Sequence, residues 1–408
     1  MQSYEEADQL ASTIRIGSLR LELEELRSNV VGAQLGQQAI HTSLKAGAVG
    51  FFAIVAIMIG IFWLPGLAAS LALALYISLT VCLISAFDIT MTLPGIAGII
   101  LSVGMAVDAN VIIFTRIREE IGLGRSVQDA VKAGFHKALS AIVDGNITTL
   151  IAAAVLYIMG TGTIKGFATT LGLGVVVSMF TALLITRSWV TAFLELGLDK
   201  KGLFGAVKER KTFDFIGKRK FFFGFALVII ASGFIGMGVY QAKTGSALNF
   251  GLDFKGGTST NVTFNQDMSL EQIDAEVKPV VAAVTGDNDI QAAKVQGTNE
   301  VIIKTRALSV EERQSLDQAL SEKFSVDQEK ITAESITGTI SGEMRRDAVL
   351  AVAIALLLML VYIRFRFSNF RFAASAIMCL CHDVLVLFAF YVLFRWSIGS
   401  SFVACMLT

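Results

Sequence analysis

The chain has 408 residues, of which 54% are hydrophobic and only 17% are charged. Soluble domains usually carry about 25% charged residues, so this composition excludes an ordinary soluble domain. It also excludes an intrinsically disordered chain, because disorder requires low hydrophobicity and high net charge. The 34 basic residues balance the 34 acidic residues. The chain therefore has no net positive charge that would favour a nucleic-acid partner.

Eight segments are long and apolar enough, or nearly so, to cross a bilayer, whose hydrocarbon core requires roughly 20 apolar residues in a helix. A ninth apolar segment starts near Trp396 and is unfinished at Thr408. Because an unfinished helix leaves unpaired backbone groups in lipid, we expect the natural C-terminus to lie further on. The predicted spans are Ala46–Leu64, Gly66–Phe87, Pro94–Phe114, Ala138–Met159, Ala168–Thr186, Phe221–Tyr240, Ala348–Ile363 and Phe372–Phe394.

The distribution of Lys and Arg predicts the orientation of these spans. Residues 115–137 hold five basic residues, residues 200–220 hold eight and residues 364–371 hold three. Basic loops face the cytoplasm, so residues 1–44 and the polar segment 241–343 are expected outside. Residues 1–44 contain no signal peptide, and we therefore expect a further span upstream of Met1.

Residues 245–343 form the one sizeable polar block, and their pattern predicts a small α+β domain. Two capping boxes, Ser269 with Gln272 and Ser309 with Glu312, open the predicted helices, although Pro279 weakens the first helix. The order of the elements resembles a ferredoxin-like domain of about 100 residues. The predicted elements are strand Thr258–Phe264, helix 270–284, strand Glu300–Thr305, helix 310–324 and strand Lys330–Ile336.

A weak internal repeat indicates that the membrane part has two related halves. Leu67–Ser70 reads Leu-Ala-Ala-Ser and Phe372–Ser375 reads Phe-Ala-Ala-Ser. Each stretch begins a span that follows another span and a short turn. Transporters are often built from two such halves, with the working site between them.

Asp108 is the first candidate for a functional residue. It lies within the predicted span Pro94–Phe114, in the stretch Gly104–Asn110. A carboxylate in hydrocarbon is costly and rarely faces lipid, so it pairs, faces water or takes a proton. We favour a proton or ion role, with Asn110 as a polar neighbour. The alternative is a solvated carboxylate near the cytoplasmic end, since Arg116 is about two turns away.

Two further polar motifs lie within predicted spans. Asp144 begins a stretch with Asn146, Thr148 and Thr149, which could line a polar path or simply mark the cytoplasmic entry of the span. His382-Asp383 lies in the middle of Phe372–Phe394. It either supports a second proton site or ties neighbouring helices together.

Other conspicuous residues are better explained as structural. The glycines of Gly251–Thr258 permit a tight turn and would join a span to the outer domain, because the phosphate-loop order is absent. Arg187 is expected to snorkel towards the inner face. Neither nucleophile, zinc nor nucleotide-binding spacing is visible, so we expect no enzyme activity, metal or cofactor. The four cysteines are expected to be small core residues: Cys82, Cys379, Cys381 and Cys405.

Several of these motifs together resemble the SecD/SecF family, the accessory membrane proteins of bacterial Sec protein export. Gly104–Asn110, Asp144–Thr149 and Gly160–Ala168 resemble membrane motifs of SecD, whereas Gly251–Thr258 and His382–Val384 resemble SecF. The resemblance implies a fused SecD–SecF arrangement in the resistance-nodulation-division superfamily. The implied fold is a multi-span α-helical membrane protein with eight spans, the start of a ninth, and one extracytoplasmic α+β ferredoxin-like domain.

The resemblance also implies a domain organisation with SecD-like and SecF-like halves, in which the first SecD span, most of its outer domain and the last two SecF spans are missing. The SecF aspartate motif would follow about eight residues after the end. The implied segments are 1–44, a remnant of the outer SecD domain; 45–195, five SecD-like spans; 196–220, a basic cytoplasmic linker; 221–240, the first SecF-like span; 241–343, the outer domain; and 344–408, incomplete SecF-like spans.

The function implied by the resemblance is assistance to export of unfolded polypeptides across the bacterial cytoplasmic membrane, driven by the proton gradient without a cofactor. The implied partners are the Sec translocation channel, its motor ATPase, a membrane insertase, the unfolded secretory polypeptide and the lipid bilayer. Asp108 alone carries over cleanly as a proton-site residue. The full set of expected site residues is Asp108, Asn110, Asp144, Thr148, Thr149, His382 and Asp383 for proton relay, and Gly251, Asp253, Gly256 and Gly257 for the structural motif.

Two other functions stay open at this point. One is an exporter of lipids or small apolar molecules in the same superfamily, which the Sec-like motifs disfavour. The other is a passive scaffold in which the acids within the spans serve only helix packing. Replacing Asp108 with Asn distinguishes the scaffold from a proton-driven subunit, since the scaffold would be unaffected.

Overall fold

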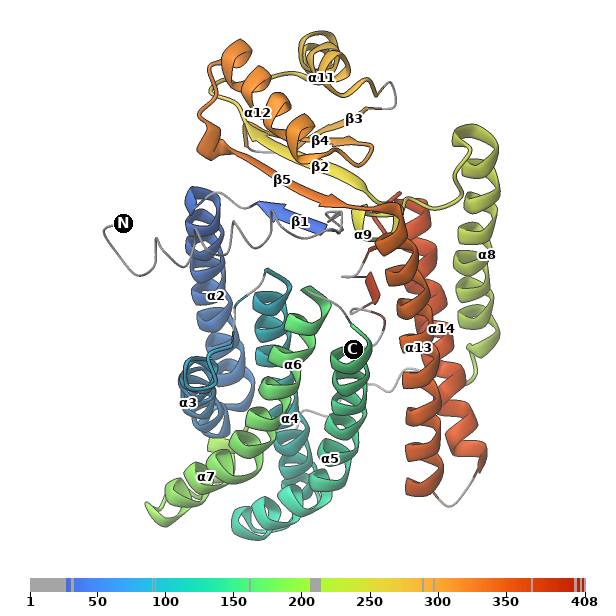
Figure 1. Cartoon of the computed structure of the whole chain (residues 1–408). Coiled ribbons are helices and arrows are strands. Elements are labelled where there is room, and N and C mark those ends of the chain that lie inside the picture. Colours follow the sequence, from blue (N-terminus) through green and yellow to red (C-terminus); the bar gives the residue numbers. More distant parts are fainter. Residues whose placement is uncertain are drawn as a thin grey trace, which may run out of the picture. The chain divides into compact units, whose positions relative to one another are not determined.

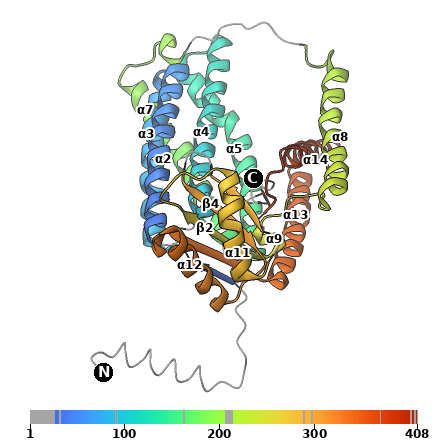
Figure 2. The same ribbon diagram turned by 90° about the horizontal axis from the view of Figure 1, so that it is seen from above.

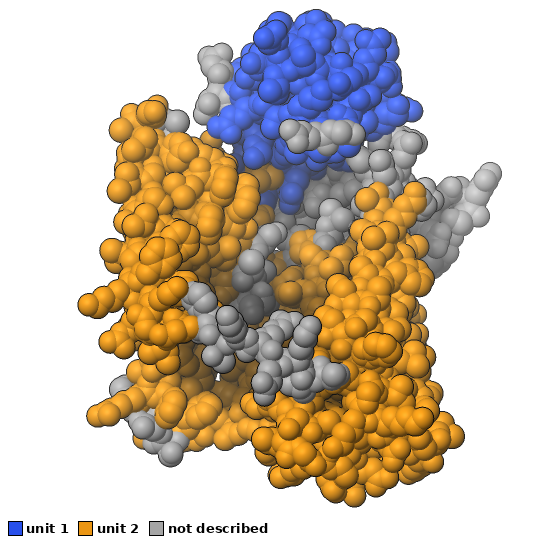
Figure 3. Space-filling model, turned by 180° about the vertical axis from the view of Figure 1, so that it is seen from behind, with its two compact units in different colours: residues 1–33, 256–340 blue, residues 34–255, 341–408 orange. Residues whose placement is uncertain are grey.

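The computed structural model describes residues 27–30, 33–89, 91, 93–160, 163–205, 214–287, 290–295, 298–367, 370–399, 402–403 and 406. The chain divides into two compact units, each formed from segments distant in the sequence (Figure 3). The outer unit combines Met1–Ala33 with Gly256–Ile340, and the membrane unit combines Gln34–Lys255 with Ser341–Thr408.

Within the described residues, the membrane unit contains eight helices long and apolar enough to cross a bilayer, which confirms the predicted number of spans (Figure 1). The predicted ninth segment is described in part: residues 396–399 are not helical, whereas Phe402, Val403 and Met406 are helical. The helices are α2 (Ala33–Phe62), α3 (Leu64–Ala86), α4 (Leu93–Gly122), α5 (Val127–Met159), α6 (Thr163–Phe180) continued by the π-helical turn η1 (Thr181–Ile185) and α7 (Thr186–Glu195), α8 (Arg219–Thr244), α13 (Gly338–Arg366) and α14 (Phe370–Leu393).

Small residues bring the first group of helices, α3, α4, α5 and α6, close together. Gly134 of α5 lies against the backbone of Ile117 in α4, where an added Cβ would come within 2.9 Å of the Ile117 nitrogen. Tyr76 of α3 donates a hydrogen bond of 2.7 Å to the Ser102 hydroxyl of α4, and Gly174 of α6 leaves room for both side chains. Such close backbone approach is how membrane helices gain packing energy, because lipid supplies little hydrophobic drive for their association.

The second group contains α8, α13 and α14, of which α8 and α14 pack closely. Figure 2 shows α8 and α14 apart from α3 and α4 when the molecule is seen from above. Gly233 of α8 faces Ala389 of α14, and an added Cβ would approach the Ala389 Cβ to 2.6 Å. Small residues therefore bring α8 and α14 together, as they do α4 and α5.

The predicted repeat has matching local structure in α3 and α14. Ser70 donates its hydroxyl to the carbonyl oxygen of Gly66 at 2.8 Å, and Ser375 donates to the carbonyl oxygen of Arg371 at 2.6 Å. Both bonds span four residues in the first turns of a helix. Ala68 and Ala373, which the repeat aligns, are both buried, with 0% and 1% exposure.

The three described cysteines contradict the prediction that they are core residues. Cys82, Cys379 and Cys381 are free thiols on exposed faces of α3 and α14; Cys405 lies outside the described residues. An apolar side chain on a span need not enter the protein core, because hydrocarbon accepts it equally well.

The outer unit is built on a five-stranded antiparallel sheet in the order β1-β5-β2-β4-β3. The predicted strands correspond to β2 (Gly257–Thr263), β4 (Glu300–Thr305) and β5 (Ile331–Ile336), whereas β1 (Arg27–Val30) and β3 (Gln291–Lys294) were not predicted. Both additional strands have four residues at the sheet edges. Pairing of β1 with β5 places this N-terminal segment in the same sheet as strands β2 to β5.

Two helical segments complete the outer unit, and both predicted capping boxes are present at Ser269 and Ser309. Pro279 does not end the first segment. A π-helical turn precedes Pro279, and in this turn the Lys278 N–H bonds to the Ile273 carbonyl oxygen. Pro279 itself lies in the first turn of the next helix, where its missing N–H is tolerated. The elements are α10 (Leu270–Gln272), η3 (Ile273–Val277), α11 (Lys278–Thr285), α12 (Val310–Phe324) and η4 (Gln328–Lys330).

A buried acid on α12 makes the stability of the outer unit depend on pH. Burial raises the pKa of the Asp317 carboxyl from its ordinary 3.8 to about 6, and the positive charge of Arg313 opposes this only in part. Within the described residues, the Asp317 Oδ1 atom has no hydrogen-bond partner. Between about pH 4 and pH 6 the folded unit therefore binds more protons than the unfolded chain, and this contribution to stability declines as the pH rises.

We predict that Asp317→Asn raises the free energy of unfolding of the outer unit by about 1–3 kcal/mol at pH 7.5, because it removes a buried charge. At pH 4 the substitution has little effect. Hydrogen–deuterium exchange of α12 amides in the full chain measures both values, with Asp327→Asn at an exposed position as the control. An equal effect at the two pH values contradicts the explanation.

Candidate functional site

Asp108 lies on α4 away from the packed face of that helix. Its neighbours Ala106, Ala109 and Asn110 are 3%, 4% and 4% exposed, whereas Asp108 is exposed. Among the described residues, no hydrogen bond or ion pair reaches the Asp108 carboxylate. The carboxylate is therefore available to water, to a proton or to a segment outside the described part of the chain.

Asn110 is turned towards the helix packing instead. Its Nδ2 donates a hydrogen bond of 3.1 Å to the carbonyl oxygen of Ala106. The buried Oδ1 atom has no partner within the part of the chain that the structure describes. Asn110 and Asp108 thus follow one another along α4 but do not contact the same groups.

Asp144 has the opposite environment, because it connects α5 to α13. Its Oδ1 atom accepts hydrogen bonds from the Tyr362 hydroxyl at 2.8 Å and from the Arg366 Nε at 2.7 Å. Its Oδ2 atom accepts one from the Ser140 hydroxyl at 3.2 Å, and Arg366 also donates to Ser140. We name Ser140, Asp144, Tyr362 and Arg366 the inter-half cluster.

The inter-half cluster follows from helix geometry. Ser140 and Asp144 are four residues apart on α5, and Tyr362 and Arg366 are four residues apart on α13. Residues with this spacing lie on one face of a helix, so two facing helices meet through two adjacent pairs. The Asp144 side chain is 22% exposed and that of Arg366 is 41% exposed, so the ion pair is partly shielded from water. Arg366, Tyr362 and Ser140 were not among the predicted site residues, although this spacing could have indicated them.

The other polar residues after Asp144 bond to their own helix. Asn146 donates to the carbonyl oxygen of Ile142 at 2.7 Å. Thr148 and Thr149 both donate to the carbonyl oxygen of Gly145, at 2.7 and 3.2 Å. Their hydroxyl hydrogens are therefore already used, while their oxygen lone pairs remain able to accept.

His382 and Asp383 contact each other on α14. The Nδ1 atom of His382 lies 2.9 Å from the Asp383 Oδ1 atom, and the two side chains are 44% and 67% exposed. The Cys379 thiol lies 4.0 Å from the other Asp383 oxygen. Among the described residues, no hydrogen bond or ion pair joins Asp108, Asp144 and Asp383 to one another, so the predicted proton-relay residues form separate groups.

The glycine motif makes backbone hydrogen bonds and contains two glycines with positive φ. The Gly251 N–H donates to the carbonyl oxygen of Ile398 at 2.9 Å, and the Ile398 N–H returns a bond of 2.8 Å to Asn249. Asp253 follows in the short helix α9 (Leu252–Lys255). Gly256 and Gly257 have φ of +76° and +118°, which side chains with a Cβ rarely adopt.

We predict that Gly257→Ala lowers the free energy of unfolding of the outer unit by about 2 kcal/mol or more. The φ is unfavourable, and the new Cβ would approach the Thr305 carbonyl oxygen to 2.5 Å. Gly286→Ala is the matched control, because Gly286 also has positive φ but has open space around it. Its expected cost is about 1 kcal/mol. Hydrogen–deuterium exchange of the β2 amides compares the two variants, and equal losses would exclude the steric contact as a cause.

We also predict that Asp144→Asn weakens the contact between α5 and α13, because it removes the counter-charge of Arg366. Spin labels at Ala141 and Phe365, both exposed, measure the distance between the helices in a chain whose cysteines are replaced by Ser. The distance distribution should broaden, and the exchange Asp144→Arg with Arg366→Asp should narrow it again. Asp129→Asn on the same helix serves as the control. An unchanged distribution in Asp144→Asn contradicts a role in joining the helices.

The architecture is that of a multi-pass membrane protein with a small outer α+β domain. Comparisons with known proteins identify the family within this class. The model for "Protein export membrane protein SecD/SecF, C-terminal" matches residues 15–195 and 316–408, and the "SecD/SecF GG Motif" matches residues 245–268. The chain belongs to the SecD/SecF family, a family of transport proteins.

Several relatives cover one or both halves of the chain. The protein translocase subunit SecDF of Bacillus subtilis is 34% identical over 99% of this chain and 56% of its own length. SecD of Acidaminococcus fermentans is 48% identical over 49% of this chain and 48% of its own length. The crystal structure of SecDF from Thermus thermophilus, a translocon-associated membrane protein, matches 100% of this chain and 54% of its own with a TM-score of 0.82 and 31% identity. The chain thus spans about half the length of these relatives.

Proposed function

We propose that the chain provides the membrane core of an accessory subunit of Sec protein export, in which proton movement assists transfer of unfolded polypeptides across the bacterial cytoplasmic membrane. The observation that carries the proposal is the contrast between two acids on neighbouring helices of a SecD/SecF family member. Asp144 is held by Tyr362 and Arg366, whereas Asp108 has no partner among the described residues.

The contrast supports different roles for the two acids. The guanidinium of Arg366 balances the negative charge of Asp144. In our proposal Asp144 therefore stays ionised, and the ion pair holds the two halves together. Asp108 has no such counter-charge, and gain or loss of a proton changes the net charge of its surroundings by one. A charge within the membrane costs several kcal/mol, so this change is large enough to alter how α4 packs.

The free energy available from the proton gradient is of the same size as the cost of a charge within the membrane. One elementary charge moved across 100 mV of membrane potential yields about 2.3 kcal/mol. Coupling requires that the change at Asp108 reaches the outer unit, and α13 offers a route because it enters the membrane unit directly after the outer unit. We propose that His382 and Asp383 form a second proton-handling pair on α14. Thr148 and Thr149 supply acceptors along α5.

The partners follow from the family. The SecDF structure from Thermus thermophilus is described as translocon-associated, and we propose the same association here, with the Sec channel, its motor ATPase, a membrane insertase and the emerging polypeptide as partners. The basic loops place residues 241–343 on the outer side, where they would meet the emerging chain. The Sec-like motifs disfavour export of small apolar molecules, and in the described part of the chain no structural feature favours it over this function.

We predict that Asp108→Asn in the full-length gene product abolishes the part of protein export that depends on the proton gradient. The ATP-driven part should persist, because the substitution removes the titrating group and nearly preserves the side-chain volume. A translocation assay in inverted membrane vesicles, with and without an ionophore, separates the two parts. Asp199→Asn, at an exposed loop position, is the matched control. Unchanged gradient-dependent export at normal protein levels would favour a passive scaffold.

A further inference from the structure

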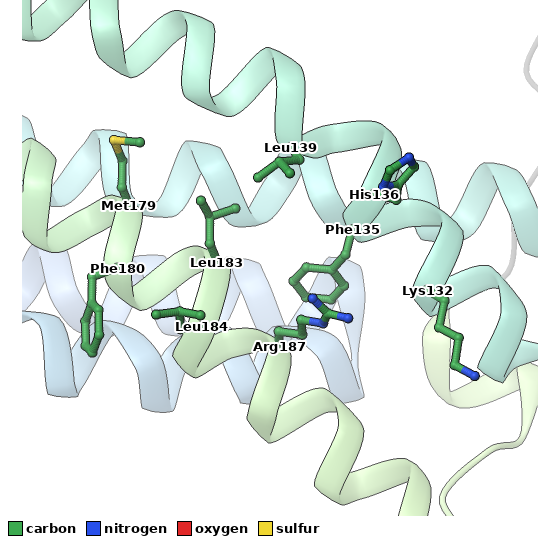
Figure 4. Close-up of a pocket in the computed structure, with 9 residues that line it drawn as sticks. All are labelled: Lys132, Phe135, His136, Leu139, Met179, Phe180, Leu183, Leu184 and Arg187. Carbon is green, nitrogen blue, oxygen red and sulfur yellow. The ribbon is translucent and has the colours of Figure 1, made fainter.

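A pocket of about 470 Å³ opens between α5 and the continuous helix α6–η1–α7 (Figure 4). None of the acids discussed above lines it. We propose that this pocket binds one anionic phospholipid of the cytoplasmic leaflet, with the phosphate at its basic end and an acyl chain at its apolar end. This inference is independent of the proposed proton role of Asp108.

One end of the pocket is basic. Lys132 and His136 are four residues apart on α5, and Arg187 comes from α7. Figure 4 shows the three side chains towards the same end of the pocket. The lining contains no acidic residue, and within the described residues none of the three side chains has an ion pair or hydrogen bond. Cationic and donor groups without a counter-charge at this position are suited to a phosphate.

The other end of the pocket is apolar. It is lined by Met179 and Phe180 of α6, which Figure 4 shows away from the basic end, and by Leu184 of η1. Phe180 and Leu184 are 46% and 55% exposed, so their surfaces are free to contact an acyl chain. A phospholipid occupies both ends of the pocket, whereas a soluble anion occupies only the basic end.

The π-helical turn η1 gives the pocket its shape. Within Thr181–Ile185 the helix is locally wider, and the Thr186 N–H bonds to the Thr181 carbonyl oxygen five residues back. The Thr186 hydroxyl donates to the same oxygen at 3.2 Å. Such single-turn insertions occur frequently at functional sites, where they redirect side chains. Here the turn carries Leu183 and Leu184 into the pocket lining.

The depth of the pocket matches a lipid headgroup. The span on α5 has 33 residues, which corresponds to about 50 Å of helix against about 30 Å of hydrocarbon. Lys132 lies in its second turn, on the side that the basic loops assign to the cytoplasm. Basic pockets between helices at this depth suit anionic headgroups. A zwitterionic headgroup would bring a positive amine towards a pocket without acids.

The test is native mass spectrometry of the full chain in mild detergent, titrated with phosphatidylglycerol or with phosphatidylcholine of the same acyl chains. We expect the wild type to bind phosphatidylglycerol more tightly. The double variant Lys132→Gln with Arg187→Gln should weaken that binding about tenfold or more, and should remove the preference over phosphatidylcholine. Leu184→Trp, which fills the apolar end without changing charge, should weaken both lipids.

The matched control is Lys200→Gln with Lys201→Gln, which removes the same charge from exposed positions outside the pocket. It should retain wild-type binding, and an equal loss in this control overturns the proposal because it indicates attraction by total charge. Displacement of phosphatidylglycerol by millimolar inorganic phosphate overturns it in favour of a soluble anion. Thermal unfolding checks that each variant is folded. Should the double variant not fold, wild-type affinity in a folded Leu184→Trp variant overturns the lipid assignment.

Discussion

A carboxylate on a membrane span must be paired, hydrated or neutralised, and this constraint organises the membrane unit. Asp144 meets it by pairing, since Arg366 and Tyr362 of α13 bind one of its oxygens and Ser140 binds the other. Asp383 meets it through its neighbour His382. Asp108 has no partner among the described residues, and this difference assigns it the proton in our account. Three acids of the same chemistry therefore obtain different roles from their surroundings.

The pairing of Asp144 also connects the two halves of the family's architecture. One family model matches both residues 15–195 and residues 316–408, and the Ser70 and Ser375 hydroxyls make the same bond in corresponding helices. The inter-half cluster joins helices from these two stretches. A proton-dependent change in one half can reach the other through such a contact, provided that the ion pair persists.

The sequence predicted the parts that depend on local pattern. Apolar length identified eight spans, and the capping boxes identified both outer helices. Contacts between distant segments were not predictable, because Asp144 and Arg366 are separated by 222 residues and Arg366 had the pattern of an ordinary loop cation. The strands β1 and β3 are short edge strands, whose pairing is decided by neighbours rather than by propensity. Exposure of the cysteines depends on which helix face meets lipid, and their apolar context did not reveal this.

The most direct test of the central claim is proton flux through the full-length gene product in proteoliposomes, followed with a pH-sensitive dye under an imposed gradient. Our account predicts that Asp108→Asn abolishes the flux, while the paired exchange Asp144→Arg with Arg366→Asp preserves part of it, since the contact between the halves is kept. Wild-type flux in Asp108→Asn would contradict the account, because the unpaired acid would then carry no proton.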